Sequence, residues 1–351
     1  MERFINGIQQ VGIGVADAQA AFEWYKNIFG TDIIVFKDTA VASLMKQYTG
    51  NIAQKRHAIL AMNMQGGGGF ELWQYCEKIP VAPAFEIALA DTGIFAVKIR
   101  CKNIEDTYNF YKSEDVNILT SPMLNPEGKK HFFIKDPWNN IFELIEDDYC
   151  FANENKFTGG VNGVLIGVAE MEKAISFYKN VLGFREEVYN DEAFYSDWKG
   201  LPGNEKKCRR VILKKFWKPT GAFGKLLGPV QIELVQALDY KPKKIFANRH
   251  WGDLGFIHVC FDLNNMKAHE KICVDNGYPL TVNSANSFNM GEAAGHFSYN
   301  EDPDGTLIEY VETHKVPIAK KFGLYLNIQK RNPKNCLPDW IVKCLRFSRA
   351  K

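Results

Sequence analysis

A strand that carries a single glutamate recurs four times in this chain of 351 residues. The copies are DPDGTLIEYVE (302–312), DPWNNIFELIE (136–146), GGFELWQY (68–75) and QIELVQ (231–236), with Glu309, Glu143, Glu71 and Glu233 as their glutamates. A carboxylate in the middle of an apolar strand is costly to bury. Four such strands indicate an internal repeat whose carboxylates are either solvated or used.

Helix signals repeat along with these strands. AFEWYKNIFG (21–30) and AISFYKNVLGF (174–184) are nearly the same, with apolar residues at helical spacing and a glycine near the end, which is typical of helix C-caps. Weaker copies occupy 105–116 and 266–278, and an alternating, β-rich segment precedes each helix. The unit is therefore a strand, a helix and about three further strands. It runs approximately over 4–80, 92–148, 160–238 and 252–313.

The second half of the repeat, 151–314, resembles a copy of the first half, 1–150, and 315–351 falls outside it. One such unit cannot cover both faces of its sheet, whereas two units can curl into a partly closed cup with helices outside. We therefore predict an α+β protein. Its four βαβββ modules should form two cup-shaped mixed sheets, each a partly closed barrel, followed by a C-terminal extension.

Composition limits the function. The net charge of +2 gives no overall field for nucleic acid, and no apolar run approaches the roughly 18–20 residues that span a bilayer. MERFINGIQQ lacks the features of a secretory signal, and the eight cysteines form no CxxC pair. These features predict a cytoplasmic protein with reduced thiols.

The segment 315–351 holds ten Lys and Arg residues and one acidic residue, Asp339, and so carries a charge of about +9. It also contains apolar side chains, among them Trp340, Leu345 and Phe347. One interpretation is an amphipathic extension packed on the modules with its basic face solvated. Contact with an anionic membrane or an acidic partner is the alternative.

The opening strand, the FYKN-LGF helix and the DPDG-x-x-x-E closing strand resemble the vicinal oxygen chelate superfamily. This superfamily contains glyoxalase I, extradiol dioxygenases and the bleomycin- and fosfomycin-resistance proteins, and the resemblance covers about 4–313. It implies the cup fold, with metal ligands taken from the first and last strands of two facing modules. The fold alone does not choose among the reactions.

Aligning the modules gives first-strand positions Gln10, Ala96, Gly163 and His258 beside the four glutamates. If neighbouring modules paired, each cup would lack one ligand. If the outer modules paired with each other, one cup would hold Gln10, Glu71, His258 and Glu309, and the inner cup would keep only Glu143 and Glu233. The resemblance to fused, four-module glyoxalase I favours the second arrangement. In that arrangement, Glu143 and Glu233 would be paired with basic side chains or hydrated in a polar pocket.

The resemblance also implies the chemistry. One divalent ion, zinc by likeness and nickel, cobalt, manganese or iron as alternatives, would hold two neighbouring substrate oxygens and stabilise an enediolate. Glu309 would be the main base, with Glu71 as its counterpart. The resemblance therefore implies a metal-dependent lyase or isomerase of the glyoxalase-like type, acting on a small molecule.

Residues two apart in a strand face the same way, so Gly12 and Gly14 should leave room above the metal, and Trp73 and Tyr75 should wall the pocket. The glycines at 66–69 predict either a mobile lip or a loose hairpin loop. His57, His131, His296 and Tyr299 are candidates for groups that support the ligands, with purely structural roles as the alternative.

The resemblance to glyoxalase I does not extend to the residues that hold glutathione. That enzyme type has Arg, Asn and Arg at the positions of Gly14, Tyr75 and Leu254. A reaction that does not depend on glutathione is therefore expected. A ring-cleaving, iron-dependent dioxygenase and a non-catalytic binding protein of the resistance type remain as alternatives. Either a monomer or a homodimer is compatible with two cups closed within one chain.

Overall fold

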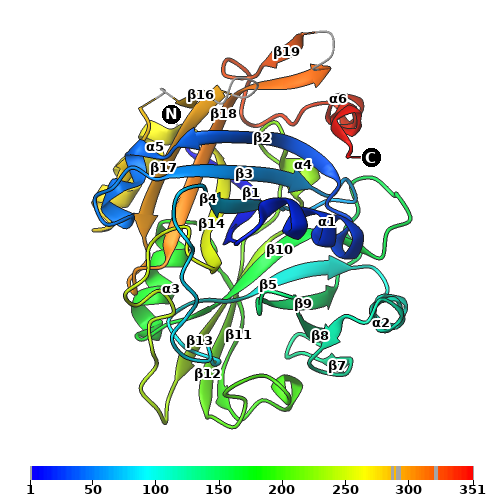
Figure 1. The fold of residues 1–351 in the computed structure, drawn as a ribbon, viewed down its shortest axis with the longest axis vertical. Helices are drawn as coiled ribbons and strands as arrows, with labels where there is room; N and C mark the ends of the chain where they lie inside the picture. Colours follow the sequence, from blue (N-terminus) through cyan, green and yellow to red (C-terminus); the bar gives the residue numbers. More distant parts are fainter. Residues whose placement is uncertain (1, 286–287, 290–293, 320–322, 351) are drawn as a thin grey trace.

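The computed structural model describes residues 2–285, 288–289, 294–319 and 323–350. Within these ranges the strands form two sheets, each curled into a cup, one above the other in Figure 1. The chain is thus the α+β arrangement of two cups that the repeat predicts.

The outer cup is built by the first and fourth modules, in the order β15-β17-β18-β14-β1-β4-β3-β2. Its strands are β1 (Phe4–Gly14), β2 (Ile33–Val41), β3 (Lys55–Met62), β4 (Gly69–Tyr75), β14 (Gly255–Asn264), β15 (Val282–Asn283), β17 (Ala294–Glu301) and β18 (Leu307–Ala319). Short strands β16 (Phe288–Asn289) and β19 (Leu324–Asn327) pair with β17 and β18. The two modules join where β1 runs antiparallel to β14.

The inner cup is built by the second and third modules, in the order β11-β12-β13-β10-β5-β9-β8-β6, with β7 beside β8. Its strands are β5 (Gly93–Cys101), β6 (Asn117–Ile118), β7 (Met123–Leu124), β8 (Lys130–Lys135), β9 (Ile141–Glu146), β10 (Thr158–Gly167), β11 (Glu186–Ala193), β12 (Cys208–Lys214) and β13 (Gln231–Ala237). Here the seam is the antiparallel pair β5 and β10. Outer modules therefore pair with each other, and so do inner modules.

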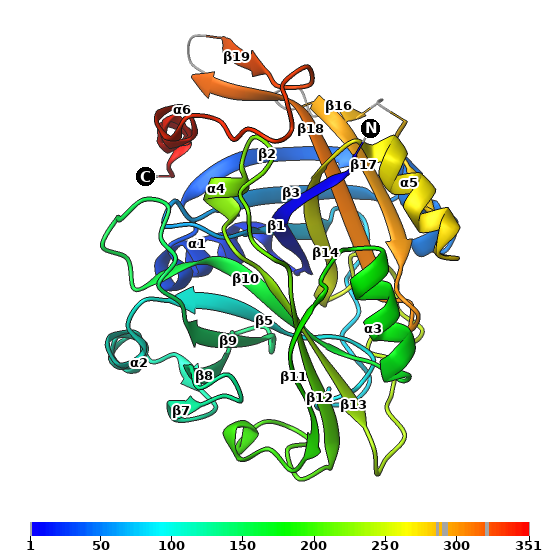
Figure 2. The ribbon, with the colours of Figure 1, turned by 180° about the vertical axis from the view of Figure 1, so that it is seen from behind.

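In every module the first strand runs parallel to the last, as in β1 with β4 and β14 with β18. Parallel neighbours need a long crossover, which the helix and intervening strands supply. The four module helices are α1 (Ala18–Phe29), α2 (Ile104–Ser113), α3 (Met171–Asn180) and α5 (Met266–Asp275), and Figure 2 shows α3 and α5 from behind.

Helix α1 illustrates how the sequence sets these elements. The Asp17 carboxylate accepts from the backbone N–H groups of Gln19 and Ala20, and Gly30 ends the helix at a φ of 61°. The helix buries Tyr25 and Phe29 against aromatic side chains of both cups. The main hydrophobic core accordingly lies between the two cups.

The repeated tyrosines link modules that are neighbours in sequence. The Tyr25 hydroxyl donates to Asp136 (2.6 Å), and the Tyr178 hydroxyl donates to Asp302 (3.0 Å). Both aspartates begin the DP turns, where their carboxylates also accept from backbone N–H groups. Each sequence half is thus held by a helix-to-turn contact, while the sheets join modules of different halves.

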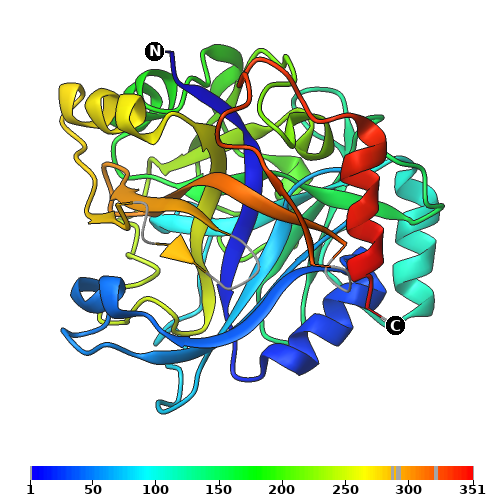
Figure 3. The ribbon, with the colours of Figure 1, turned by 90° about the horizontal axis from the view of Figure 1, so that it is seen from above.

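The C-terminal extension packs on the edge of the outer cup, with residues 320–322 and 351 outside the described ranges. Helix α6 (Asp339–Lys343) and the 3₁₀ turn η4 (Cys344–Ser348) lie beside β2, where Ala350 N donates to Asp32 O (2.8 Å). Arg349 pairs with Asp32 (3.1 Å) and Glu154 (2.5 Å). Figure 3 shows this segment in red from above. Several of its basic groups are therefore neutralised within the chain, and no described helix is long and apolar enough to cross a membrane.

Candidate metal centre

Three buried side chains of the outer cup converge on one point. Glu71 on β4, His258 on β14 and Glu309 on β18 each present a ligand atom, and these atoms lie within 4.8 Å of one another. His258 Nε2 is 3.0 Å from Glu309 Oε2 and 3.5 Å from Glu71 Oε2. Glu71 is 187 positions from His258 and 238 positions from Glu309 in sequence, yet the three residues form one cluster.

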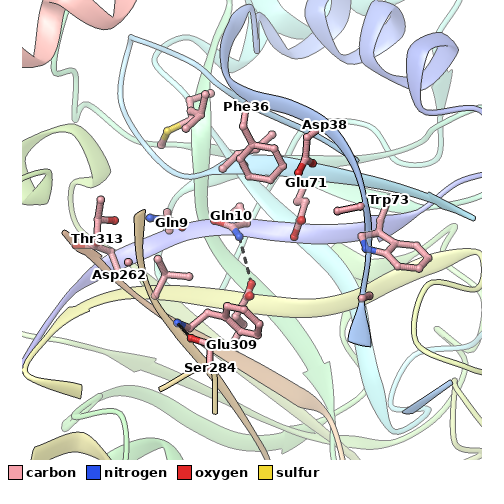
Figure 4. A pocket seen from close by; sticks show the side chains of 18 of the residues that line it. Gln9, Gln10, Phe36, Asp38, Glu71, Trp73, Asp262, Ser284, Glu309 and Thr313 are labelled. Atoms are coloured by element: carbon pink, nitrogen blue, oxygen red, sulfur yellow. Dashed lines mark hydrogen bonds between the residues drawn. The ribbon is translucent and has the colours of Figure 1, made fainter. Parts of the chain in front are cut away.

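Gln10 on β1 completes the cluster. Its Nε2 donates to Glu309 Oε2 (3.2 Å), and its buried Oε1 has no hydrogen-bond partner among the described residues. Oxygen and nitrogen of an amide are assigned from the surrounding network. Rotation of this amide would turn Oε1 toward the carboxylates, so Gln10 can offer a fourth ligand atom, an oxygen. Figure 4 shows Gln10 beside Glu71 and joined to Glu309 by a dashed line.

The arrangement fits a bound cation. Two metal–ligand bonds of about 2.1 Å at 90–110° hold their ligand atoms about 3.0–3.4 Å apart, close to the separations seen here. Although His258 Nε2 is near both carboxylates, neither of its ring nitrogens forms a hydrogen bond of good geometry within the described part of the chain. Buried polar atoms that converge without satisfying each other are the donor set that a metal ion would complete.

The electrostatics of the cluster also favour a bound cation. Burial lowers the pKa of His258, but Glu309 and Glu71 outweigh burial and raise it to about 9. Two carboxylates thus favour a positive charge at this point. A metal ion would supply that charge and displace the imidazole proton, since a coordinating histidine must be neutral.

Gly12 was expected to leave room for substrate above the metal, but in the structure the His258 ring takes up the space beside it. It pairs with His258 across the β1–β14 seam and with Glu71 on the other side. A Cβ at Gly12 would lie 2.2 Å from His258 Cε1, so the ring fills the space that the glycine leaves. Gly12 therefore makes room for the His258 side chain and does not line the cavity.

A cavity of about 420 Å³ opens beside the cluster, and Gln10, Glu71, Trp73 and Glu309 line it. Gly14 and Tyr75 do not line it, contrary to expectation. A Cβ at Gly14 would lie 2.0 Å from the Asp253 carbonyl oxygen, so backbone already covers this glycine. The Tyr75 hydroxyl is turned away to donate to the Trp251 carbonyl.

Several lining residues were not singled out from sequence. Trp251 lies in the connection before β14 and is nearly parallel to the His258 ring (6.3 Å, 15°), and no repeat signal marks it. Tyr299, one of the candidate supporting groups, lines the cavity edge-on to His258. Asp38 and Arg56 form an ion pair at the cavity wall. Alternation in β17 and β2 would have placed Tyr299 and Asp38 on a face, but not next to the cluster.

The glycines at 66–69 form neither a mobile lip nor a loose hairpin. They are buried between the cups, where Gly67 N donates to Leu226 O and Gly68 N donates to Val161 O (both 2.8 Å). A Cβ at Gly67 would lie 2.6 Å from the Gly160 carbonyl carbon. Glycine is required here because two backbones approach each other closely.

The inner cup holds an ionic network at the equivalent place. Lys98 lies between Glu143 (2.7 Å) and Glu233, all fully buried. His131 Nδ1 is 2.7 Å from Glu143, Arg210 Nε donates to Glu233 (2.5 Å), and Asp197 contacts both of these basic groups. Lys98 pairs in register with Glu143 as Gly12 does with Glu71, so an ammonium group extends from the position that is glycine in the outer cup.

This network explains how Glu143 and Glu233 can be buried, because basic side chains pair with both carboxylates. Burial raises the pKa of Glu143, but Lys98 and His131 outweigh it and hold that pKa well below its usual range. The sequence does carry a signal for this pairing. Lys98 lies in the apolar strand IFAVKIRC, where a buried lysine needs carboxylate partners. The other two histidines named as candidate supporting groups lie apart from both clusters: His57 contacts Thr39 and His296 contacts Asn283.

Comparisons with known proteins agree with this architecture. Family models described as Glyoxalase/Bleomycin resistance protein/Dioxygenase superfamily match residues 7–144 and 163–298. The chain belongs to this superfamily.

Individual relatives are distant. A metallothiol transferase FosB of Staphylococcus haemolyticus is 26% identical over 156 residues, which cover 43% of this chain and 94% of that protein. Among solved structures, a putative dioxygenase of Bacillus subtilis aligns with a TM-score of 0.58 and 12% identity, covering 88% of this chain and 85% of that one. Glyoxalase I of Zea mays aligns with a TM-score of 0.50 and 14% identity, covering 89% and 92%. These structures share the fold.

Proposed function

We propose that the outer cup is a metal centre in which Gln10, Glu71, His258 and Glu309 hold one divalent cation. The observation that carries this proposal is the convergence of three buried ligand atoms within 4.8 Å on strands of two modules. Three oxygen ligands and one imidazole suit a borderline ion with open coordination positions. Zinc is the first choice by likeness, and nickel, cobalt, manganese or iron fit the same set.

The reaction proposed for this centre is proton transfer at carbon, as in a glyoxalase-like lyase or isomerase. When bound, the cation would supply a Lewis acid that stabilises negative charge on two neighbouring substrate oxygens. Glu309 would remove a proton from the adjacent carbon, and Glu71 would act as its counterpart. Both carboxylates line the cavity and approach Gln10 from different strands (Figure 4). Trp73 and Trp251 would exclude water from one side.

Two alternative reactions are less well supported. Iron-dependent ring-cleaving dioxygenases use two histidines and one carboxylate, whereas this cluster has one histidine. The FosB relative is named a metallothiol transferase, and its likeness covers less than half of this chain. A non-catalytic binding protein of the resistance type is the third possibility, and metal content separates it from the enzyme. We expect a cytoplasmic monomer or homodimer that acts on a small molecule.

Metal content tests the centre. Protein expressed with ample zinc, nickel, cobalt, manganese and iron should retain close to one equivalent of a divalent metal, measured by elemental analysis after gel filtration. His258→Gln together with Glu309→Gln should reduce it below about 0.1 equivalent. Glu312→Gln is the matched control, because this glutamate of β18 contacts the backbone N–H of Asn265 outside the cluster. Metal retained by the double variant would overturn the proposed centre.

Isotope exchange tests the reaction. The metal-loaded protein should exchange the α-proton of a suitable 2-hydroxy ketone or thioester with solvent deuterium. Glu309→Gln should keep metal, because its amide oxygen can still coordinate, and should lose exchange by a factor of about 10²–10⁴. Full exchange in this variant would remove Glu309 as the base, and oxygen uptake with catechols would favour the dioxygenase.

A further inference from the structure

The cavity of the outer cup has a polar end and an apolar end. Gln10, Glu71 and Glu309 lie at the polar end. We call a second part of the lining the apolar wall, which consists of Val35, Met62, Leu226, Leu227, Val316 and Leu345. All six belong to one hydrophobic cluster, whereas Trp73, Trp251 and Tyr299 near the metal centre belong to another. The cavity therefore continues well beyond the point where a metal-bound head group would sit.

The apolar wall is assembled from distant parts of the chain. Leu226 and Leu227 come from the short helix α4 (Gly224–Leu227), which belongs to an inner module, and Leu345 comes from the C-terminal extension. Both segments are fixed in place: Leu226 O accepts from Gly67 N (2.8 Å), and Leu337 N donates to Ala222 O (3.0 Å). Segments outside the repeat of the outer cup thus extend its cavity with apolar surface.

Charge restricts what can enter. Among the described lining residues, four carry carboxylates, namely Asp38, Glu71, Asp262 and Glu309. Arg56 is the one cationic side chain of this lining, and it is paired with Asp38. A ligand with a phosphonate, or with the two carboxylates of glutathione, would find no unpaired cation away from the metal centre. The remainder of the ligand should therefore be uncharged.

We propose that the outer cup takes a small molecule whose head carries two adjacent oxygens and whose remainder is an uncharged aliphatic chain or ring lying on the apolar wall. This inference rests on the proposed metal centre for the head group. A volume of about 420 Å³, at about 30 Å³ for each water-sized atom, holds roughly fourteen non-hydrogen atoms. Leu345 helps to set the specificity of the site because it lines the cavity from the C-terminal extension, as part of the apolar wall.

Alkyl hydroxamates test the proposal, because each has two adjacent oxygens and a chain of chosen length. Binding of acetyl, butanoyl, octanoyl and hexadecanoyl hydroxamates to the zinc-loaded, full-length protein would be measured by calorimetry. Affinity should rise about twofold to fourfold per methylene up to the octanoyl compound, because each buried CH₂ adds a constant increment. It should stop rising before the hexadecanoyl compound, which exceeds the cavity.

Leu345→Asp should lower affinity for the octanoyl compound about tenfold or more and leave the acetyl compound within twofold. Phe347→Asp is the matched control, since this side chain of the same segment is 75% exposed and does not line the cavity. Equal loss in both variants, or an affinity that does not change with chain length, would overturn the proposed class of substrate.

Protein stripped of metal separates this inference from the proposed function. If the octanoyl compound binds with the same affinity with and without metal, and depends on Leu345, the apolar site stands and the metal centre fails. If all hydroxamates bind with metal but without dependence on chain length, the metal centre stands and the apolar substrate fails. Absence of binding by every compound contradicts both.

Discussion

Gly12 and His258 are partners across the β1–β14 seam, and a Cβ on Gly12 would lie 2.2 Å from Cε1 of the histidine ring. The same glycine pairs with Glu71 on its other side. The absence of a side chain at Gly12 therefore leaves the space that the His258 ring occupies, with Nε2 close to both carboxylates. The inner cup has Lys98 at this position, and there the lysine itself supplies the positive charge.

Gly12→Ala should displace the His258 ring and lower metal affinity at least tenfold, measured by competition with a chromophoric chelator. Because Gly12 has an ordinary backbone conformation, the loss should arise from the ring and not from backbone strain. Gly128→Ala is the control: its Cβ meets nothing within 4 Å, although its φ of 73° gives a backbone penalty of about 1 kcal/mol. Unchanged metal affinity in Gly12→Ala would show that the histidine is not a ligand.

Gln10→Ala should weaken metal binding by about tenfold to a hundredfold while the protein stays folded. The reason is the loss of one oxygen donor from a set in which both carboxylates and His258 remain. Gln9→Ala provides the comparison, since Gln9 also lines the cavity but its amide oxygen faces Cys260. Calorimetric titration of zinc into both variants checks the expectation, and equal affinities would leave the cluster with three protein ligands.

Lys98→Met should destabilise the protein by about 3–5 kcal/mol in urea unfolding, because it leaves Glu143 and Glu233 buried without their shared cation. Neutralising both carboxylates as well, in Lys98→Met with Glu143→Gln and Glu233→Gln, should recover much of this loss. Neither protein should lose its metal. A loss of metal from the single variant, in a protein that remains folded, would indicate that the inner cup takes part in binding.

Asp262 should make stability depend on pH. Burial raises the pKa of this carboxyl to about 7, with the Asn6 amide opposing the shift and Glu312 adding to it. The unfolded pKa is about 3.9, so the stabilisation is complete below about pH 4 and is lost as the pH rises through 7.

Asp262→Asn stays neutral, so its unfolding free energy relative to the natural protein should increase between pH 5 and 8. Three pKa units at about 1.4 kcal/mol each set an upper limit of about 4 kcal/mol. Asp191→Asn, at an exposed position of β11, should show no such trend. A difference that does not vary with pH would mean that Asp262 is ionised in the folded protein throughout this range.

Much of the fold could be predicted because the repeat is local. The FYKN helices, the DP turns and the strands with one glutamate are each specified within about fifteen residues. The proposed ligand positions Gln10 and His258 followed from aligning these copies. The roles given to Gly12, Gly14 and Tyr75 were wrong because alternation along a strand places a residue on a face but does not say what covers that face.

The sequence alone determined that four similar modules exist and that four of their residues have the chemistry of metal ligands. Only the tertiary structure decided which modules share a sheet, and it brought Glu71, His258 and Glu309 within 4.8 Å of one another. It also decided that α4 and the C-terminal extension line the cavity of the outer cup. The physical reason is that strand pairing and packing join residues far apart in the chain, and no local pattern records those contacts.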